Sequence, residues 1–258
     1  MPFISGGSLR ERLEQQGRFS IEQTLHVGHQ IAEGLAAAHA QGLVHRDIKP
    51  ANILFSADHE HIVITDFGLA RAADDASITQ TGILAGTPHF MSPEQAKGEP
   101  IDGRSDLFSL GSLLFTLVTG QVPFHAESSF GVLRQITDHA APRVSELEPV
   151  APAWLDNLIS KLHTRQPDGR YASAEELSRL TSSCLDAERD PTKSIPEELL
   201  PTKRAWPRVL AAACILLAMI GLSVAMRPTT ESSLTGNTAG NVAIDTEGQV
   251  FELSLIHI

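Results

Sequence analysis

The apolar residues of the first 186 positions recur mainly at the three- and four-residue intervals of helices, and polar turns separate the apolar segments. In the segment after Ser20, Leu25, Ile31, Leu35 and Ala38 lie at helical spacing. One face of a helix there is therefore expected to be buried. Because strand signals are few, we predict a mainly α-helical domain.

Three Ser-x-x-Glu/Gln patterns predict where helices begin, since the serine and the third residue after it can each bond the other's backbone N–H. The three pairs are Ser8 with Glu11, Ser20 with Gln23, and Ser173 with Glu176. A further stretch, Leu107–Val118, is apolar on nearly all sides. It predicts a helix in the middle of the domain.

Two short β-branched segments, 53–55 and 62–65, flank a polar turn and predict a small β-hairpin. The turn contains His59, Glu60 and His61, which have the side chains of metal ligands. No third ligand follows nearby in the sequence, so a solvated turn is the better interpretation.

A different pattern occurs near the C-terminus, where no charged residue interrupts the apolar run between Arg208 and Arg227. As a helix the run would extend roughly 27 Å, at the short end of a bilayer span. A buried core helix is the alternative. The two flanking arginines and Trp206, at the position of an interfacial residue, favour a transmembrane helix over residues 208–227 in a lipid bilayer.

The charges around this helix predict its orientation. Lys203, Arg204 and Arg208 precede the apolar run, whereas Arg227 is the only Lys or Arg that follows it. By the positive-inside rule, the N-terminal domain is expected in the cytoplasm and the C-terminus outside. The protein would then be a single-pass protein of the cell (inner) membrane.

The segments on either side of the apolar run have the composition of loops. Residues 187–207 contain four prolines and little periodicity, which predicts a juxtamembrane linker. Residues 228–258 are rich in Thr, Ser, Gly and Asn and are too few to bury much of a core. We interpret them as the truncated start of an extracytoplasmic segment, whose last residues, LSLIHI, resemble translated adapter sequence.

Composition narrows the classes of protein. The 258 residues are 42% hydrophobic and 20% charged, as in globular chains. The formal net charge of −11 argues against a nucleic-acid partner, since phosphate contacts require clustered Lys and Arg. Cys184 and Cys214 are the only cysteines, so a disulfide framework is excluded.

Four short motifs follow one another within the predicted helical domain. They are His45-Arg46-Asp47-Ile48-Lys49-Pro50-Ala51-Asn52, Asp66-Phe67-Gly68, Gly86-Thr87-Pro88 and Ser92-Pro93-Glu94. Each is weak alone, but in this order and spacing they resemble the catalytic half of a protein kinase. The resemblance implies that residues 1–186 form a partial kinase domain, the hinge and the large C-terminal lobe.

The resemblance also implies roles in phosphoryl transfer, which requires neutralised charge and aligned groups. Asp47 would accept or orient the proton of the attacking hydroxyl. Lys49, the residue of serine/threonine kinases at that position, would reach the transferring phosphate. Asn52 and Asp66 would bind Mg²⁺ together with ATP, since oxygen ligands suit this hard cation. The alternative for all four is a solvated loop of charged residues.

The segment that follows Asp66 resembles a kinase activation segment. Thr79 and Thr81 match the Thr-x-Thr pair of bacterial receptor-like kinases, and a phosphate on either could pair with Arg46. The alternative is that both threonines are ordinary polar loop residues. Thr87 would lie beside the acceptor hydroxyl.

Five further residues are structural by resemblance. His45 and Phe67 are expected to pack in the core. Glu94 is expected to form a buried ion pair with Arg170. Asp106 is expected to accept backbone hydrogen bonds from the catalytic loop.

The elements of a kinase small lobe do not occur in this sequence: a Gly-rich loop, a strand lysine and the glutamate that pairs with it. Pro2, Phe3 and Ile4 resemble the hinge that contacts ATP, so the chain is expected to begin partway through the domain. Because several groups that stabilise the transition state are missing together, these residues alone are expected to have negligible kinase activity.

The resemblance as a whole implies a membrane-anchored bacterial receptor-like serine/threonine protein kinase. Its substrates would be Ser/Thr hydroxyls of proteins, and homodimers would promote autophosphorylation. The alternative is a membrane-tethered, pseudokinase-like scaffold that serves as a docking module. The intact set of Asp47, Asn52 and Asp66 disfavours the scaffold, because docking does not require these side chains.

Overall fold

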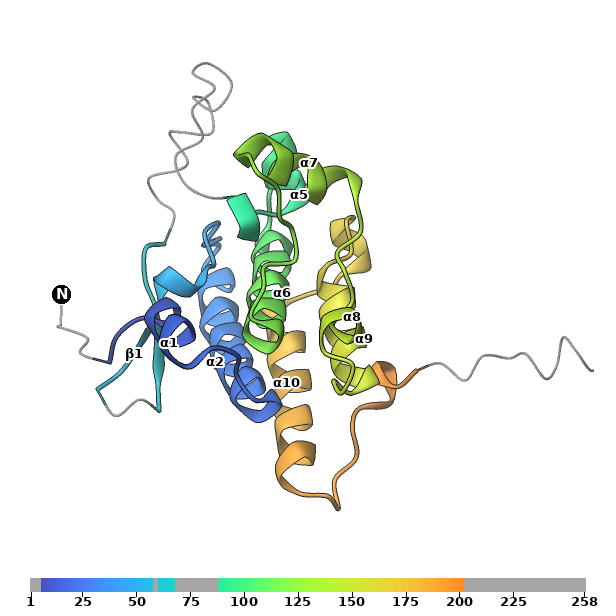
Figure 1. Ribbon diagram of the computed structural model, residues 1–258. Helices are drawn as coiled ribbons and strands as arrows, with labels where there is room; N and C mark the ends of the chain where they lie inside the picture. The colour runs from blue at the N-terminus through green and yellow to red at the C-terminus, as the bar shows by residue number, and fades with distance from the viewer. Residues whose placement is uncertain (1–5, 58–59, 68–87, 202–258) are drawn as a thin grey trace, which may run out of the picture. The chain divides into compact units, whose positions relative to one another are not determined.

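The computed structural model describes residues 6–57, 60–67 and 88–201, and these ranges confirm a mainly helical domain with a small hairpin (Figure 1). The helices are α1 (Leu9–Gln16), α2 (Ile21–His39), α5 (Pro93–Lys97), α6 (Gly103–Thr119), α7 (Ser129–Asp138), α8 (Val144–Leu147), α9 (Ala153–Leu162) and α10 (Ala174–Arg189). Short 3₁₀ turns are η1 (Pro50–Asn52), η2 (Pro88–Phe90), η3 (Pro167–Gly169) and η4 (Glu197–Leu199). The strands are β1 (Ile53–Phe55) and β2 (Ile62–Ile64).

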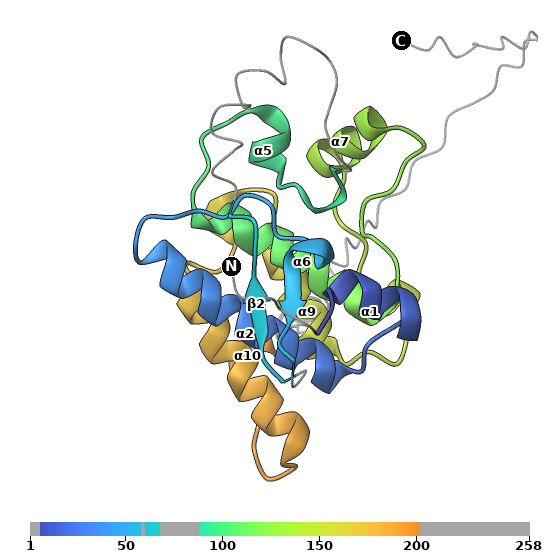
Figure 2. The same ribbon diagram turned by 90° about the vertical axis from the view of Figure 1, so that its left-hand side faces the viewer.

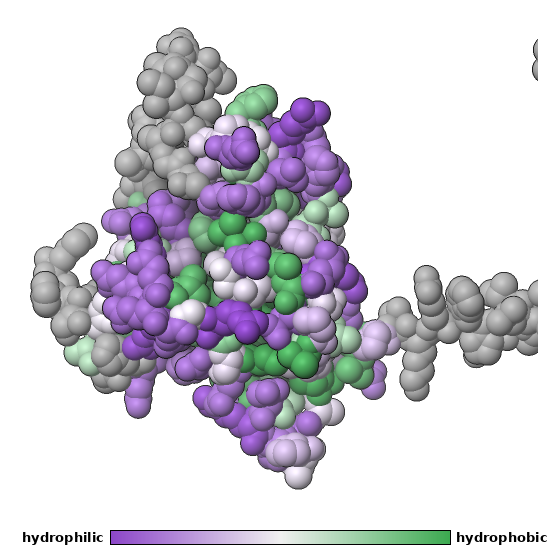
Figure 3. Space-filling view, viewed as in Figure 1, coloured by the Kyte–Doolittle hydropathy of each residue, from purple (hydrophilic) through white to green (hydrophobic). Residues whose placement is uncertain are grey.

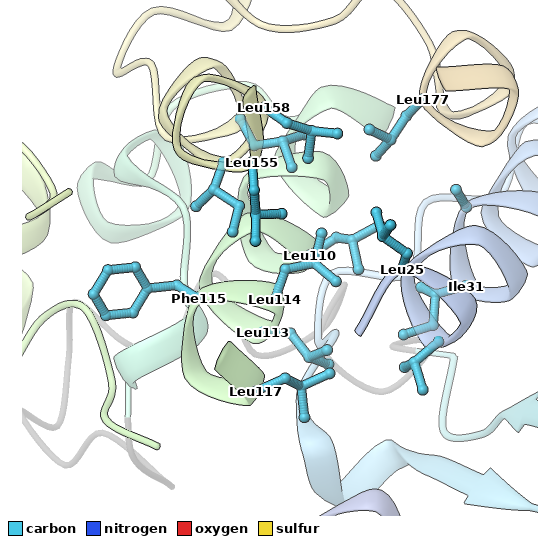
Figure 4. Close-up of a cluster of buried hydrophobic side chains, with 14 of the residues drawn as sticks. Leu25, Ile31, Leu110, Leu113, Leu114, Phe115, Leu117, Leu155, Leu158 and Leu177 are labelled. Atoms are coloured by element: carbon cyan, nitrogen blue, oxygen red, sulfur yellow. The ribbon is translucent and has the colours of Figure 1, made fainter. Parts of the chain in front are cut away.

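Helix α6 forms the centre of the core, and every residue from Ser105 to Thr119 is buried. The predicted helix over 107–118 is thus confirmed and extends four residues further toward the N-terminus, to Gly103, behind the Asp102 cap. Helix α10 packs on α2, while α2 and α9 both pack on α6. Figure 4 shows the α6 leucines between the apolar side chains of α2 and α9.

The predicted capping boxes at α1 and α2 are complete, with both reciprocal bonds present. The predicted box at α10 is only half formed. Ser173 Oγ accepts from the Glu176 N–H at 3.1 Å, but the Glu176 carboxylate accepts from the Ala172 N–H at 2.6 Å. The carboxylate therefore accepts the N–H of Ala172, one residue before the Ser173 N–H that a capping box uses.

The hairpin is antiparallel, with Ile53 opposite Ile64, and β2 faces the viewer in Figure 2. At the turn, Ser56 Oγ donates to the His61 carbonyl at 2.9 Å and accepts from the His61 N–H at 3.1 Å. Among the described residues, no group of three or more His, Cys, Asp or Glu could hold a metal ion. His59 lies outside these residues.

Residues 187–201, the first part of the segment predicted to be a linker, pack on the domain. Arg189, at the end of α10, pairs with Glu22 of α2 at 2.7 Å. Leu199 of η4 is 2% exposed, and its carbonyl accepts from the Asn157 side chain of α9 at 2.9 Å. The proline-rich composition conceals this contact because one buried leucine in a 3₁₀ turn produces no periodic pattern.

Polar residues cover most of the face seen in Figure 3, and the hydrophobic residues visible there are interspersed with them. Of the helices in the described part of the chain, none is long and apolar enough to cross a membrane. The predicted span over 208–227 and the segment 228–258 lie outside that part.

Candidate active site

The loop between α2 and η1, which carries Asp47, is anchored to the central helix by Asp106. This fully buried carboxylate accepts the His45 N–H at 2.8 Å and the Arg46 N–H at 2.7 Å. The backbone bonds implied by the resemblance are therefore present. His39, the last residue of α2, adds a ring nitrogen 2.8 Å from Asp106 Oδ2. Because α6 is buried along its length, this anchor fixes the loop to the core.

His45 links the loop to the segment that follows the hairpin. It is fully buried, and its ring centroid lies 4.6 Å from that of Phe67, so both residues pack as expected. Its Nδ1 accepts the Asp47 N–H at 3.2 Å, so the ring proton is on Nε2, which donates to the Thr65 carbonyl at 2.9 Å. One neutral imidazole thus ties the Asp47 backbone to the strand that leads to Asp66.

Two residues of the site have left-handed backbone angles, with φ of 68° at Arg46 and 59° at Asp66. Non-glycine residues rarely adopt this region, and such conformations persist only where surrounding contacts hold them. Arg46 immediately precedes Asp47. The backbone of this loop is therefore held in a strained form at the residue before the carboxylate.

The Asp47 carboxylate is oriented by two side chains, one from the same loop and one from η1. Lys49 Nζ lies 2.7 Å from Asp47 Oδ2, and Asn52 Nδ2 donates to the same oxygen at 3.1 Å. Asn52 Nδ2 also donates to the Asp47 carbonyl at 2.9 Å. A carboxylate fixed in this way is suited to accept a proton from a hydroxyl placed beside it.

Asn52 and Asp66 come together at the open end of the hairpin. Asn52 precedes β1, and its carbonyl accepts from the Thr65 N–H at 2.9 Å, directly before Asp66. The Asn52 amide nitrogen is used for Asp47, so its side-chain oxygen is the atom that can bind a cation. With the exposed Asp66 carboxylate, this oxygen donor set fits Mg²⁺, which retains waters and phosphate oxygens as its other ligands.

The ion pair expected between Glu94 and Arg170 is present and buried. Arg170 Nη1 and Nη2 lie 2.7 and 2.8 Å from the two Glu94 oxygens. The remaining three guanidinium N–H groups donate to the carbonyls of Thr164, Arg104 and Arg165. Burial raises the pKa of Glu94, but hydrogen bonds from Arg170 and Ser105 outweigh it, so the pKa lies below its ordinary value.

A cavity of about 530 Å³ borders Lys49. Its lining includes Arg10, Leu13, Glu14, Ala51, His89, Phe90, Thr116 and Val122. Arg10 and Glu14 pair with each other at 2.9 Å. The cavity is therefore lined by both apolar and charged or polar side chains, and it lies next to the Asp47–Lys49 pair.

Several predicted site residues lie outside the residues that the structure describes. They are Pro2, Phe3, Ile4, Thr79, Thr81 and Thr87. The pairing of Arg46 with a phosphorylated threonine therefore stays a prediction.

Two residues that help to hold the catalytic loop were not predicted from the sequence: Gln95 contacts the loop, and His39 contacts Asp106, which anchors it. His39 approaches Asp106, and Gln95 Nε2 donates to the Arg46 carbonyl at 2.8 Å. Gln95 carried a detectable signal, since Ser92 and Gln95 form a further capping box at the start of α5. His39 carried none, because a histidine in a last helical turn commonly interacts with the helix end itself.

The large lobe of a protein kinase is defined by the features described above. These are a loop carboxylate beside a lysine, oxygen ligands at the end of a hairpin, and a buried Glu–Arg ion pair. The protein kinase domain family matches residues 1–187 of this sequence. The chain belongs to the protein kinase family.

Similar proteins are bacterial serine/threonine kinases. Serine/threonine-protein kinase PknL of Mycobacterium tuberculosis (strain ATCC 25618 / H37Rv) is 42% identical over 174 residues, which cover 67% of this chain and 43% of that protein. Serine/threonine-protein kinase PrkC of Bacillus subtilis (strain 168) is 31% identical over 260 residues, covering 86% of this chain and 40% of PrkC. The chain thus spans less than half of the length of either relative.

Proposed function

We propose that this protein transfers the γ-phosphate of ATP to Ser/Thr hydroxyls of proteins. The observation that carries the proposal is the Asp47 carboxylate, which is fixed by Lys49 at 2.7 Å and by Asn52 at 3.1 Å. A proton acceptor and a cation in contact are what in-line attack by a hydroxyl on a phosphate requires. A purely structural loop would not require either.

In this mechanism Asp47 accepts a hydrogen bond from the acceptor hydroxyl and orients its oxygen toward the phosphate. Lys49, now paired with Asp47, lies close enough to exchange that contact for a phosphate oxygen. The Asn52 oxygen and the Asp66 carboxylate would hold Mg²⁺, which when bound would neutralise phosphate charge. The family generally uses ATP and Mg²⁺, and the oxygen donors of Asn52 and Asp66 fit Mg²⁺.

The cavity beside Lys49 is the proposed binding place for the acceptor segment. A peptide whose hydroxyl lies at Asp47 must pass Lys49, and a neighbouring side chain of that peptide can enter the hollow next to Ala51 and Phe90. The cavity thus offers contact area on the acceptor side of the site, which supports a macromolecular rather than a small hydroxyl substrate.

The test is Mg²⁺-dependent transfer of labelled phosphate from ATP to peptides that differ only in a Ser, Thr or Tyr acceptor. We expect transfer to Ser and Thr by a protein that extends this chain upstream with a Gly-rich loop and a strand lysine. We expect the 258 residues alone to transfer at least about 10²-fold more slowly, because several transition-state contacts are missing together. Transfer to Tyr alone, or none by the extended protein, would refute the proposal.

We also propose that residues 208–227 anchor the protein in the cell membrane, with the kinase domain in the cytoplasm. The proposal is supported by the uncharged apolar run and by the basic residues before it. Homodimers that phosphorylate Thr79 or Thr81 in one another are part of the same proposal, on the resemblance alone. Release of the protein from membranes by alkaline carbonate would exclude the anchor.

A further inference from the structure

Gln95, the third residue of α5, uses the two ends of its side-chain amide for two different contacts. Its Oε1 accepts the Ser92 N–H at 3.0 Å and completes the capping box of α5. Its Nε2 donates to the Arg46 carbonyl at 2.8 Å. One amide therefore connects the start of α5 with the backbone of the catalytic loop.

The Arg46 carbonyl belongs to the peptide unit that joins Arg46 to Asp47. The N–H of the same peptide unit, that of Asp47, donates to His45 Nδ1 at 3.2 Å. The preceding N–H, that of Arg46, donates to Asp106 at 2.7 Å. Gln95 thus supplies a contact that holds the carbonyl end of this peptide, at a residue whose φ is 68°.

Helix α5 is itself fixed in place next to Gln95. The preceding residue, Glu94, forms the buried ion pair with Arg170 and also accepts from Ser105 Oγ at 2.5 Å. Gln95 is partly buried, so its bond to Arg46 is shielded from competing water. Glu94 therefore connects α5 to the core, and the next residue, Gln95, connects it to the catalytic loop.

We propose that Gln95 is a positioning residue for the phosphoryl transfer. This inference rests on the function proposed above. Gln95 keeps Arg46 in its left-handed conformation, and the Asp47 carboxylate is thereby held ready for the acceptor hydroxyl. When the Gln95 donor is lost, the strained peptide can rotate, and the carboxylate samples orientations that do not meet the hydroxyl.

The first experiment compares Gln95→Glu with Gln23→Glu in the chain of 258 residues. Glutamate keeps the acceptor for the serine N–H of the capping box and removes only the donor. Gln23 is a matched control, since Ser20-Ile21-Glu22-Gln23 and Ser92-Pro93-Glu94-Gln95 both form Ser-x-Glu-Gln boxes. Amide hydrogen exchange of Asp47, measured by NMR, is expected to accelerate about 3- to 10-fold in Gln95→Glu and to stay unchanged in Gln23→Glu.

A second variant separates positioning from helix stability. Gln95→Lys keeps a donor for the Arg46 carbonyl but loses the acceptor for the Ser92 N–H. We expect Gln95→Lys to lower the Tm while leaving exchange at Asp47 close to that of the parent, the reverse of Gln95→Glu. If exchange at Asp47 instead follows the Tm across both variants, Gln95 acts only through the helix and the inference is wrong.

The activity measurement uses the protein extended upstream. Gln95→Glu is expected to lower kcat about 3- to 10-fold with the KM for ATP unchanged, and Gln95→Lys to restore most of it. If the parent transfers phosphate and Gln95→Glu keeps the parental kcat, the inference fails and the proposed function stands. If the parent transfers none, the proposed function fails, while hydrogen exchange still decides whether Gln95 holds the peptide.

Discussion

Replacement of Asp47 by Asn is expected to lower kcat by about 10²- to 10⁴-fold in the protein extended upstream, with the KM for ATP nearly unchanged. Asparagine has the size of aspartate but cannot accept the proton of the acceptor hydroxyl. The other parts of the site remain, because His45 and Asp106 hold the backbone of the loop and not the Asp47 side chain. The loss should therefore fall on the chemical step, measured by single-turnover phosphate transfer.

Asp186→Asn is the matched control for this change. Asp186 forms an exposed ion pair with Lys193 at 2.7 Å, far along the chain from the loop. Exposed pairs contribute little, so stability and kcat should both stay near the parental values. If Asp47→Asn retained more than about a tenth of the parental kcat, while Asp186→Asn behaved as expected, Asp47 would not be the proton acceptor.

Of the residues that the motifs single out, the structure places Lys49 and Asn52 in contact with Asp47. Asn52 and Asp66 are 14 positions apart in the sequence, yet the hairpin between them brings their backbones to one end. That outcome follows from local rules, because two β-branched segments around a polar turn pair in one register. Glu94 and Arg170 are far apart in the sequence, and their ion pair could be predicted only from the resemblance to kinases.

Contacts made by single side chains across the fold could not be predicted in this way. The bond from Gln95 to the Arg46 carbonyl depends on where α5 lies against the loop, and the Ser92 pattern predicts only the helix start. Likewise, Leu199 is buried because η4 meets α9, although its own segment has the composition of a linker. Hydrophobic periodicity predicts which face of a helix or strand is buried, but it does not predict isolated contacts between distant side chains.

Replacement of Arg170 by Leu is expected to cost about 3–5 kcal/mol of unfolding free energy at pH 7, because it leaves the buried Glu94 carboxylate without its partner. Three backbone carbonyls lose their donors as well. The control is Arg189→Leu, which removes an ion pair with Glu22 that is about half exposed on both sides. That variant should lose less than about 1 kcal/mol, with both values measured by urea unfolding.

The pH dependence of the same comparison identifies the cause of the loss. In the parent the pKa of Glu94 lies below the usual 4.5, since hydrogen bonds from Arg170 and Ser105 outweigh burial. Its charge therefore stabilises the fold above about pH 4.5, and this stability is lost as the pH falls through the folded pKa. In Arg170→Leu the charge and hydrogen bonds of Arg170 are lost, and only Ser105 and the backbone still oppose burial. We therefore expect the pKa of Glu94 to rise above its usual value in the folded variant, so that folding takes up a proton and lower pH destabilises the variant less than the parent. The difference in unfolding free energy between the parent and Arg170→Leu should then become smaller from pH 7 to pH 4. A difference that stays constant over this range would mean that lost packing, and not an unpaired charge, destabilises the variant.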